Sequence, residues 1–345
     1  KIFSNSNQIA LLYYEVFKMR IEATDLKYMD IDRAEQIMNH PLLRSDDRAL
    51  SLKAKSHFYL IHQFFAEMKG DKLASREFAF KYLNLLQNNP KFTKRRDTQN
   101  IIFAIYNYLG RCRETNYYQD IDLLLDELKA IKPEYLALKI FHFELLSEVT
   151  LATIIHKREF KEVDQKIDSI LVELEKRKER IRSYCQQRVY QYVTIIRIIQ
   201  GRFKEALDMN LATLEASQLP GTRGDMELAA KILNLILHLE LSNHLLVPNL
   251  IRSIAYQIKK QSYSLMLEKQ LLHSINKLAQ SPENQTQDLL VNFLQEVQQL
   301  EREKEIITPM VEHLDLTVWI QSRIEKTTML AIYNRRKAES QSSKA

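Results

Sequence analysis

The stretch YQYVTIIRIIQGRFKEALDMNLATLEASQLP, from Tyr190 to Pro220, decides the fold. Its apolar residues recur every three or four positions, which is the spacing of one face of an α-helix. Gly201 interrupts the pattern, and glycine enters the left-handed backbone region that ends a helix without steric cost. Pro220 ends the second helical stretch, because proline lacks an amide hydrogen and clashes with a preceding helical turn. The stretch predicts two helices that must stack on neighbours to bury both apolar faces.

This helix pair resembles a tetratricopeptide repeat (TPR). The matching residues are Gly201 at the turn, Phe203, the pair Glu205 and Ala206, Thr213, Leu214 and Glu215 in the second helix, and Tyr190, Val193 and Thr194 in the first. Arg197 stands where the family usually has tyrosine. A second match comprises Phe58, Ile61, Phe65 and Ala74. The resemblance implies an α-solenoid, a right-handed superhelix of antiparallel helix pairs.

Regular spacing of turn signals supports a repeat architecture. Pro41, Pro90, Pro133 and Pro220 are separated by 49, 43 and 87 residues, the last being about twice 43. The turns within repeats are expected near Lys27, Gly70, Asn116, Arg158, Gly201 and Ser242, at spacings of 43, 46, 42, 43 and 41. Self-similarity of this kind is typical of solenoids. We therefore predict an all-α fold with a period of about 43 residues, longer than the 34 residues of a standard TPR.

Three regions follow from this pattern. Residues 1–305 are expected to form six to seven TPR-like helix pairs, and residues 306–336 to form C-terminal capping helices anchored by Trp319. Residues 337–345, KAESQSSKA, are expected to be disordered. The segment WIQSRIEK, from Trp319 to Lys326, also resembles the ends of uncharacterised helical-repeat proteins from Bacteroidota.

Composition narrows the class of protein. The 345 residues include 5 glycines and 7 prolines, which disfavours sheets with tight turns and glycine-rich phosphate loops. No apolar run approaches the roughly 18 residues that span a bilayer, so we expect no membrane insertion. Cys112 and Cys185 cannot form a disulfide framework and are expected to be buried thiols. A cytoplasmic location is therefore expected.

Sequence motifs for catalysis are absent. The chain contains no G-x-x-x-x-G-K, no G-x-S-x-G and no H-E-x-x-H pattern. His57 and His62 are five residues apart, so on a helix they point in different directions and make a poor metal pair. We expect no enzymatic activity, no cofactor and no metal.

The chain carries a net charge of +6. Its basic clusters lie at Lys94 to Arg96, at Lys176 to Arg182 and at Arg335 to Lys337. A basic cluster in a loop with Phe92 nearby could contact phosphates and stack on a base. The chain has 50 basic and 44 acidic residues, so the excess of positive charge is modest. Nucleic acid is therefore an alternative partner rather than the expected one.

In proteins of the TPR kind the first helices of successive repeats line a concave surface that takes an extended peptide or a partner helix. The matched repeats place a set of polar and aromatic residues there, and Arg111 and Arg188 among them could pair with a carboxylate. The expected peptide-binding residues are Ser56, Tyr59, Gln63, Asn107, Tyr108, Arg111, Arg188, Gln191 and Tyr192. For any single member, an ordinary contact between repeats is the competing interpretation.

The sequence therefore predicts a non-catalytic scaffold that binds a protein or peptide. Two alternatives remain open: the ligand-binding or dimerising part of a regulator or sensor, and an RNA- or DNA-binding α-solenoid. The chain begins at Lys1 rather than methionine, so we expect it to be a fragment. An uncapped first repeat would leave Ile9, Leu12 and Phe17 partly bare, which predicts either a missing domain or self-association.

Overall fold

The computed structural model describes the chain except residues 25–30, 90–97, 220–223, 260–265, 303–313 and 343–345. Within the described residues the fold is all-α, with 16 α-helices, a few short 3-10 helices and no strand. The all-α prediction is confirmed. The chain divides into two compact units, Lys1–Thr150 and Leu151–Ala345, with the boundary inside one helix.

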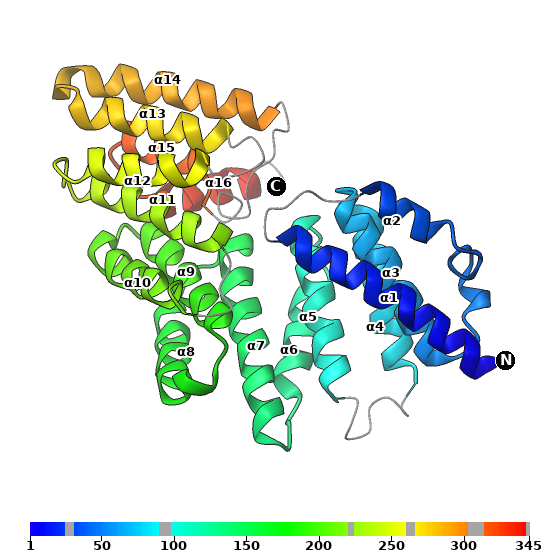
Figure 1. The fold of residues 1–345 in the computed structure, drawn as a ribbon. Coiled ribbons are helices and arrows are strands. Elements are labelled where there is room, and N and C mark those ends of the chain that lie inside the picture. Colours follow the sequence, from blue (N-terminus) through cyan, green and yellow to red (C-terminus); the bar gives the residue numbers. More distant parts are fainter. Residues whose placement is uncertain (25–30, 90–97, 220–223, 260–265, 303–313, 343–345) are drawn as a thin grey trace. The chain divides into compact units, whose positions relative to one another are not determined.

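The first unit is built from successive helices, each packed on its neighbours (Figure 1). It comprises α1 (Ile2–Thr24), α2 (Ile31–Met38), α3 (Leu52–Met68), α4 (Lys72–Gln87), α5 (Thr98–Glu114), α6 (Ile121–Ala130) and the start of α7 (Leu136–Lys157), with 3-10 helices at Pro41–Leu43 and Asp46–Arg48. Apolar residues from α1 to α7 form one continuous core. Removing this apolar surface from water is the main term that favours folding.

The second unit contains the remaining helices. They are the end of α7, α8 (Val163–Arg177), a 3-10 helix at Lys178–Arg180, α9 (Ser183–Ile199), α10 (Phe203–Ala216), α11 (Gly224–Glu240), α12 (Val247–Lys259), α13 (Met266–Gln280), α14 (Glu283–Arg302), α15 (Leu316–Ile324) and α16 (Met329–Ser342). Consecutive helices from α9 to α16 pack on one another. The stretch from Tyr190 contains two helices, α9 and α10, joined at Gly201, as its periodicity predicts.

Six helices end in the same way, with a residue of positive φ at the chain reversal. These residues are Gly70, Asn116, Arg158, Gly201, Ser242 and Lys326. In each case the following amide donates to the carbonyl five residues back, as Asp71 does to Ala66 at 2.9 Å and Arg202 does to Arg197 at 2.8 Å. This is the Schellman motif, which satisfies carbonyls that a helix end leaves free. The first five are turns expected from sequence, whereas Lys27 lies outside the described residues.

The C-terminal helices reach back to the middle of the second unit. Helix α15 packs on α14, and α16 packs on α9. Trp319 is 1% exposed, and its indole Nε1 donates to Glu240 Oε1 at 2.7 Å. Tyr333 of α16 stacks on Phe160, with ring centroids 6.1 Å apart. Trp319 is therefore an anchor, and the C-terminal segment contacts helices from several positions in the stack.

The residues expected to be disordered are in part helical. Helix α16 extends to Ser342, so residues 337–342 continue it, and 343–345 lie outside the described residues. The physical reason is composition, because Lys, Ala, Glu and Gln in KAESQ are all good helix formers. Cys112 and Cys185 are both buried free thiols, as expected. None of the helices in the described ranges is long and apolar enough to cross a membrane.

The apolar residues of α1 that are exposed to solvent are not the ones expected from the sequence. Ile9 is fully buried, and Leu12 and Phe17 pack against the core, so the prediction that these three are bare is wrong for Ile9. The reason is that α1 turns its Ile9 face toward α3. The exposed apolar residues of α1 are instead Ile2, Phe3, Leu11 and Tyr14, which are 59%, 79%, 65% and 62% exposed.

The packing of α16 near the α9–α10 turn gives a test. A Cβ at Gly201 would lie 2.9 Å from Thr328 Cγ2, whereas a Cβ at Gly70 would meet nothing within 4 Å, although both glycines have positive φ. We expect Gly70→Ala to lower the free energy of unfolding by about 1 kcal/mol through backbone strain alone. Gly201→Ala should cost about 2–4 kcal/mol, because the clash adds to that strain.

Urea unfolding of the full chain measures both effects. Thr328→Ser removes the clashing methyl group and keeps the hydroxyl that accepts from the Ala331 amide at 3.1 Å. Combined with Gly201→Ala it should return the cost to the Gly70→Ala level. Equal costs for the two glycine variants, or no rescue by Thr328→Ser, would show that Thr328 does not pack on this turn.

Candidate functional site

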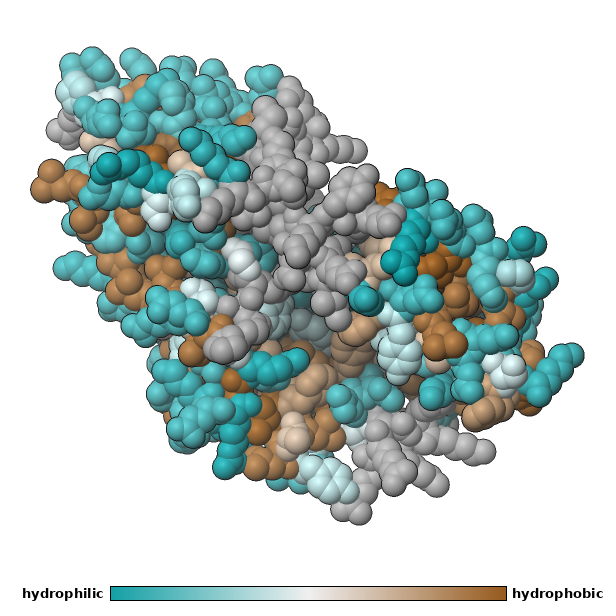
Figure 2. Space-filling model, viewed as in Figure 1, coloured by the Kyte–Doolittle hydropathy of each residue, from teal (hydrophilic) through white to brown (hydrophobic). Residues whose placement is uncertain are grey.

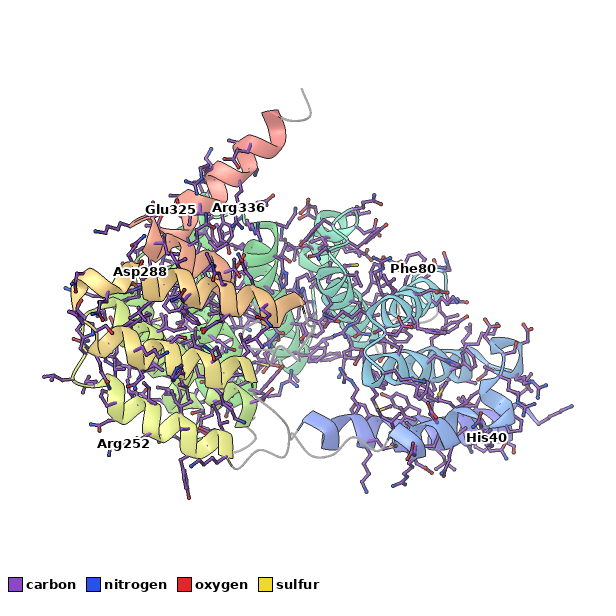
Figure 3. The ribbon with its side chains drawn as sticks, turned by 90° about the horizontal axis from the view of Figure 1, so that it is seen from above. His40, Phe80, Arg252, Asp288, Glu325 and Arg336 are labelled. Carbon is purple, nitrogen blue, oxygen red and sulfur yellow. The ribbon has the colours of Figure 1, made fainter. Side chains whose placement is uncertain are left out.

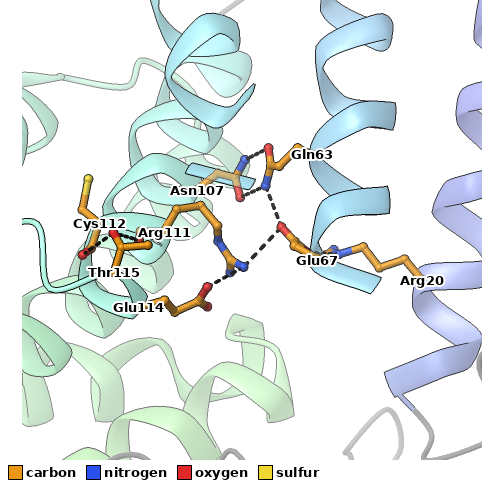
Figure 4. Close-up of polar contacts among 8 residues, drawn as sticks. All are labelled: Arg20, Gln63, Glu67, Asn107, Arg111, Cys112, Glu114 and Thr115. Carbon is orange, nitrogen blue, oxygen red and sulfur yellow. Dashed lines mark hydrogen bonds and ion pairs between the residues drawn. The ribbon is translucent and has the colours of Figure 1, made fainter. Parts of the chain in front are cut away.

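A row of charged side chains crosses three helices of the first unit (Figure 4). Arg20 of α1 pairs with Glu67 of α3, with Nε 2.8 Å from Oε2. Arg111 of α5 lies 3.3 Å from the other Glu67 oxygen and 2.8 Å from Glu114. We call these four residues the charged strip. It links α1, α3 and α5 through one carboxylate held between two guanidinium groups.

A reciprocal pair of amides lies beside the charged strip. Gln63 Nε2 donates to Asn107 Oδ1 at 2.9 Å, and Asn107 Nδ2 donates back to Gln63 Oε1 at 2.7 Å. Gln63 Nε2 donates its second hydrogen to Glu67 Oε1 at 2.7 Å. Gln63 is fully buried and Asn107 is 7% exposed. Because buried amides are costly unless hydrogen-bonded, this pair ties α3 to α5 in one geometry.

Helical spacing explains why these groups meet. Gln63 and Glu67 are four residues apart on α3, and Asn107 and Arg111 are four apart on α5, so each pair lies on one face of its helix. The partners across helices are 44 residues apart in the chain. The Gln63 amide of α3 therefore contacts the Asn107 amide of α5, and the Glu67 carboxylate of α3 contacts the Arg111 guanidinium of α5.

The charged strip is partly accessible. The side chains of Glu67 and Arg111 are 13% and 17% exposed, and those of Arg20 and Glu114 are 33% and 27% exposed. Burial raises the pKa of the Glu67 carboxyl, but Arg20, Arg111 and the Gln63 amide outweigh it and lower that pKa overall. Glu67 is therefore a carboxylate at neutral pH. Arg111 Nε is buried and has no acceptor among the described residues.

Three other expected site residues of the first unit do not join the charged strip. Ser56 is buried and donates to the carbonyl of Leu52 at 3.0 Å. The Tyr59 hydroxyl donates to Asp46 Oδ2 at 2.7 Å, and burial together with that carboxylate raises the pKa of Tyr59 to about 12. The third, Tyr108, is buried and donates to Asp120 at 3.2 Å. These side chains stabilise local packing.

The expected site residues of α9 belong to the second unit. The Arg188 guanidinium lies 4.9 Å from the centroid of the Tyr192 ring and donates to its hydroxyl at 2.5 Å. Gln191 and Tyr192 are 4% and 1% exposed. Both are therefore interior residues. Of the nine expected residues, the structure brings together Gln63, Asn107 and Arg111 in the first unit, and Arg188 and Tyr192 in the second.

Sequence reasoning missed Arg20, Glu67 and Glu114. The signal was the interval of about 43 residues expected from the turn spacing, since Arg20, Gln63 and Asn107 are separated by 43 and 44 residues. A search for polar residues recurring at that interval would have added Arg20. Glu67 and Glu114 required only one further helical turn, because they lie four and three residues after Gln63 and Arg111.

Several residues of the described basic clusters are paired with acidic or amide groups. Arg177 and Lys178 pair with Glu173 and Glu175 on the same stretch of helix. Arg335 pairs with Glu325 at 2.9 Å, and Arg336 donates to Gln321 at 2.7 Å. Glu325 and Arg336 are labelled in Figure 3. The cluster at 94–96 lies outside the described residues. In the described ranges, no group of three or more His, Cys, Asp or Glu side chains could hold a metal ion.

Comparison with known proteins gave no match among family models, curated proteins or solved structures. Function is therefore inferred from the side chains of this chain. The TPR resemblance and a Bacteroidota relationship remain predictions. The all-helical fold with packing between consecutive helices is consistent with a helical-repeat protein.

The charged strip makes a prediction about stability. Glu67→Gln leaves two guanidinium groups beside a neutral amide, so the free energy of unfolding should fall by about 1–3 kcal/mol. The matched control is Glu77→Gln on α4, which removes an exposed pair with Lys81 and should cost less than about 0.5 kcal/mol. Urea unfolding measures both, and equal costs would show that the strip does not hold the helices together.

A half-buried histidine of the first unit predicts a pH dependence. His57 of α3 stacks on Tyr13 of α1, with ring centroids 4.7 Å apart. Burial and then Lys53 lower the pKa of His57 from 6.5 to about 4. The neutral ring is favoured in the folded state, so its stabilising effect is complete above pH 6.5 and is lost as the pH falls toward 4.

His57→Phe keeps the stacked ring and cannot titrate, so its stability should fall less than that of the unaltered chain between pH 6.5 and 4. His244→Phe, at an exposed position, is the control and should leave that fall unchanged. Thermal unfolding at a series of pH values measures this. Identical profiles for the His57 variant and the parent would contradict the assignment.

Proposed function

We propose that the chain is a non-catalytic scaffold of TPR-like helical repeats that binds a protein or peptide partner. The observation that carries this proposal is the charged strip on α1, α3 and α5, which are first helices of successive repeats in that scheme. First helices of TPR-like repeats line the concave surface. The strip is therefore the expected place for a ligand.

The chemistry of the charged strip favours an acidic partner group. Arginine presents donors in a fixed planar fork that matches a carboxylate. Arg111 already holds Glu67 and Glu114 through one nitrogen, and its Nε has no acceptor among the described residues. Because that Nε is buried, a side-chain or C-terminal carboxylate of a peptide would instead pair with the exposed part of the guanidinium group, since the Arg111 side chain is 17% exposed. Because the guanidinium groups are held in place before binding, little further ordering is needed.

Burial divides the expected site into two roles. Gln63 and Asn107 are too buried to touch a partner and would instead hold α3 and α5 in register. Arg20, Arg111 and Glu114 retain accessible surface and would make the contacts.

Apolar groups on α1 give independent support for a protein partner. Phe3, Leu11 and Tyr14 are 79%, 65% and 62% exposed. Their spacings of eight and three residues place them on one side of the helix. Exposed apolar groups that share a helix face are typical of interaction sites. A second copy of the chain or a separate protein would cover them, and we infer a cytoplasmic setting for either.

The test is a pull-down from the native host with the full chain as bait, with nuclease present throughout. The double variant Arg20→Lys/Arg111→Lys keeps both positive charges and removes both planar guanidinium groups. Arg76→Lys on α4, where the guanidinium lies 4.4 Å from the centroid of the Tyr117 ring, is the control. We expect the parent and the control to recover the same protein and the double variant to lose it at least tenfold. Recovery of nucleic acid, or a partner retained by the double variant, would overturn the proposal.

A further inference from the structure

Arg113 of α5 carries a charge that the first unit does not neutralise. The residue is 8% exposed, and its Nη1 is enclosed and has no hydrogen-bond acceptor. With the described residues its guanidinium group forms neither an ion pair nor a hydrogen bond. Arg197 of α9 is equally buried, at 6% exposed, but it pairs with Asp164. Because arginine keeps its proton, an unpaired buried guanidinium group costs free energy and indicates a site for an anion.

The carboxylates of neighbouring helices do not offset this charge. Glu148 of α7 accepts from the Tyr106 hydroxyl at 2.8 Å. Tyr106 precedes Arg113 by seven residues on α5, so that carboxylate contacts α5 about 10 Å from Arg113 along the helix axis. The charged strip has two guanidinium groups and two carboxylates, so its own charges cancel.

Charges around the thiol of Cys112 leave one positive charge in excess. Burial raises the pKa of this thiol to about 11, so it is neutral at pH 7. Arg76 and Arg113 lower that pKa and Asp120 raises it, which places two cations and one anion around the thiol. The excess of one charge matches a carboxylate, whereas a phosphate group carries about −1.5 to −2.

Gly110 leaves space beside the Arg113 guanidinium group. Its φ is not positive, unlike those of Gly70 and Gly201, so α5 does not need glycine there for its backbone conformation. A Cβ at Gly110 would lie 3.9 Å from Arg113 Nη2, and outside its own helix no other described heavy atom lies within 4 Å of that point. An oxygen atom about 1 Å closer to Nη2 would be at hydrogen-bond distance. The space is therefore suited to one oxygen of a ligand.

We propose that Arg113 and the bare backbone at Gly110 form a binding site for an acidic side chain of the peptide partner. One carboxylate oxygen accepts from Nη2, and since the charge is delocalised over the guanidinium group, it also offsets the charge at the enclosed Nη1. A side-chain carboxylate projects from its backbone and so reaches a largely covered guanidinium group, whereas a chain terminus would have to bring the backbone with it.

This site deepens the proposed function and rests on it, because it gives the same helix α5 a second contact with an acidic peptide. It uses neither Arg20 nor Arg111. The two hypotheses can therefore be separated by substitution.

Urea unfolding of the full chain tests whether Arg113 lacks a partner. Arg113→Met keeps an unbranched side chain and removes the charge, so the urea midpoint should rise. Arg197→Met, at an equally buried arginine that is paired, should lower the midpoint. A lower midpoint for Arg113→Met would show that the fold itself satisfies this guanidinium group, and would overturn the inference.

Three pools of fluorescein-labelled heptapeptides identify the ligand. The first has Glu at the central position and an amidated C-terminus, the second has a free C-terminal carboxylate and no acidic residue, and the third is amidated without an acidic residue. The other positions are random, because the face of the first unit seen in Figure 2 carries both hydrophobic and hydrophilic side chains. Fluorescence anisotropy should show the first pool bound at least tenfold more tightly than the third. Equal binding of these two pools, or tighter binding of the second pool than of the first, would overturn the inference.

Two variants link this binding to the site. Arg113→Met and Gly110→Ala should each weaken binding of the first pool at least tenfold. Gly110→Ala fills the space with a methyl group, yet it should raise the urea midpoint because alanine is the better helix former. Gly224→Ala, at the first residue of α11, is the control and should bind like the parent. Unchanged binding by Arg113→Met would overturn the inference.

The pull-down separates this site from the proposed function. A protein partner that Arg20→Lys/Arg111→Lys loses and Arg113→Met retains would support the scaffold and overturn the carboxylate site at Arg113. Binding of the first pool that depends on Arg113, with no protein recovered in the pull-down, would support the carboxylate site and overturn the scaffold.

Discussion

The structure depends on one constraint: a helix with apolar residues on more than one face must be covered from more than one side. Helix α9 is the extreme case, with 14 of its 17 residues buried. Helices α10, α11 and α16 all pack on it, and Arg197 pairs with Asp164 of α8. Such a helix is stable only within an assembled unit, because short isolated helices are marginal in water.

Polar contacts then decide how the helices align. Apolar contact alone tolerates a shift along the helix axis, whereas a reciprocal amide pair such as Gln63 and Asn107 is satisfied in one arrangement. Arg197 acts in the same way between α8 and α9.

The same requirement limits which side chains remain free for a ligand. The more completely a helix is covered by neighbouring helices, the fewer of its polar residues reach solvent. On α9, for example, both Gln191 and Tyr192 are buried. Polar side chains remain accessible to solvent where a helix is only partly covered by its neighbours. In the first unit these are the side chains of the charged strip.

The sequence by itself determined that the chain folds into helices, and it located five of the reversals between them. These depend on periodicity and on single residues such as Gly70 and Gly201, which act through their own backbone conformation. Only the tertiary structure decided which polar residues meet. Arg20 and Glu67 are 47 residues apart in the chain, and Trp319 and Glu240 are 79 apart. Hydrogen bonds and ion pairs form between atoms a few ångströms apart, and local periodicity cannot say which distant helices are packed together.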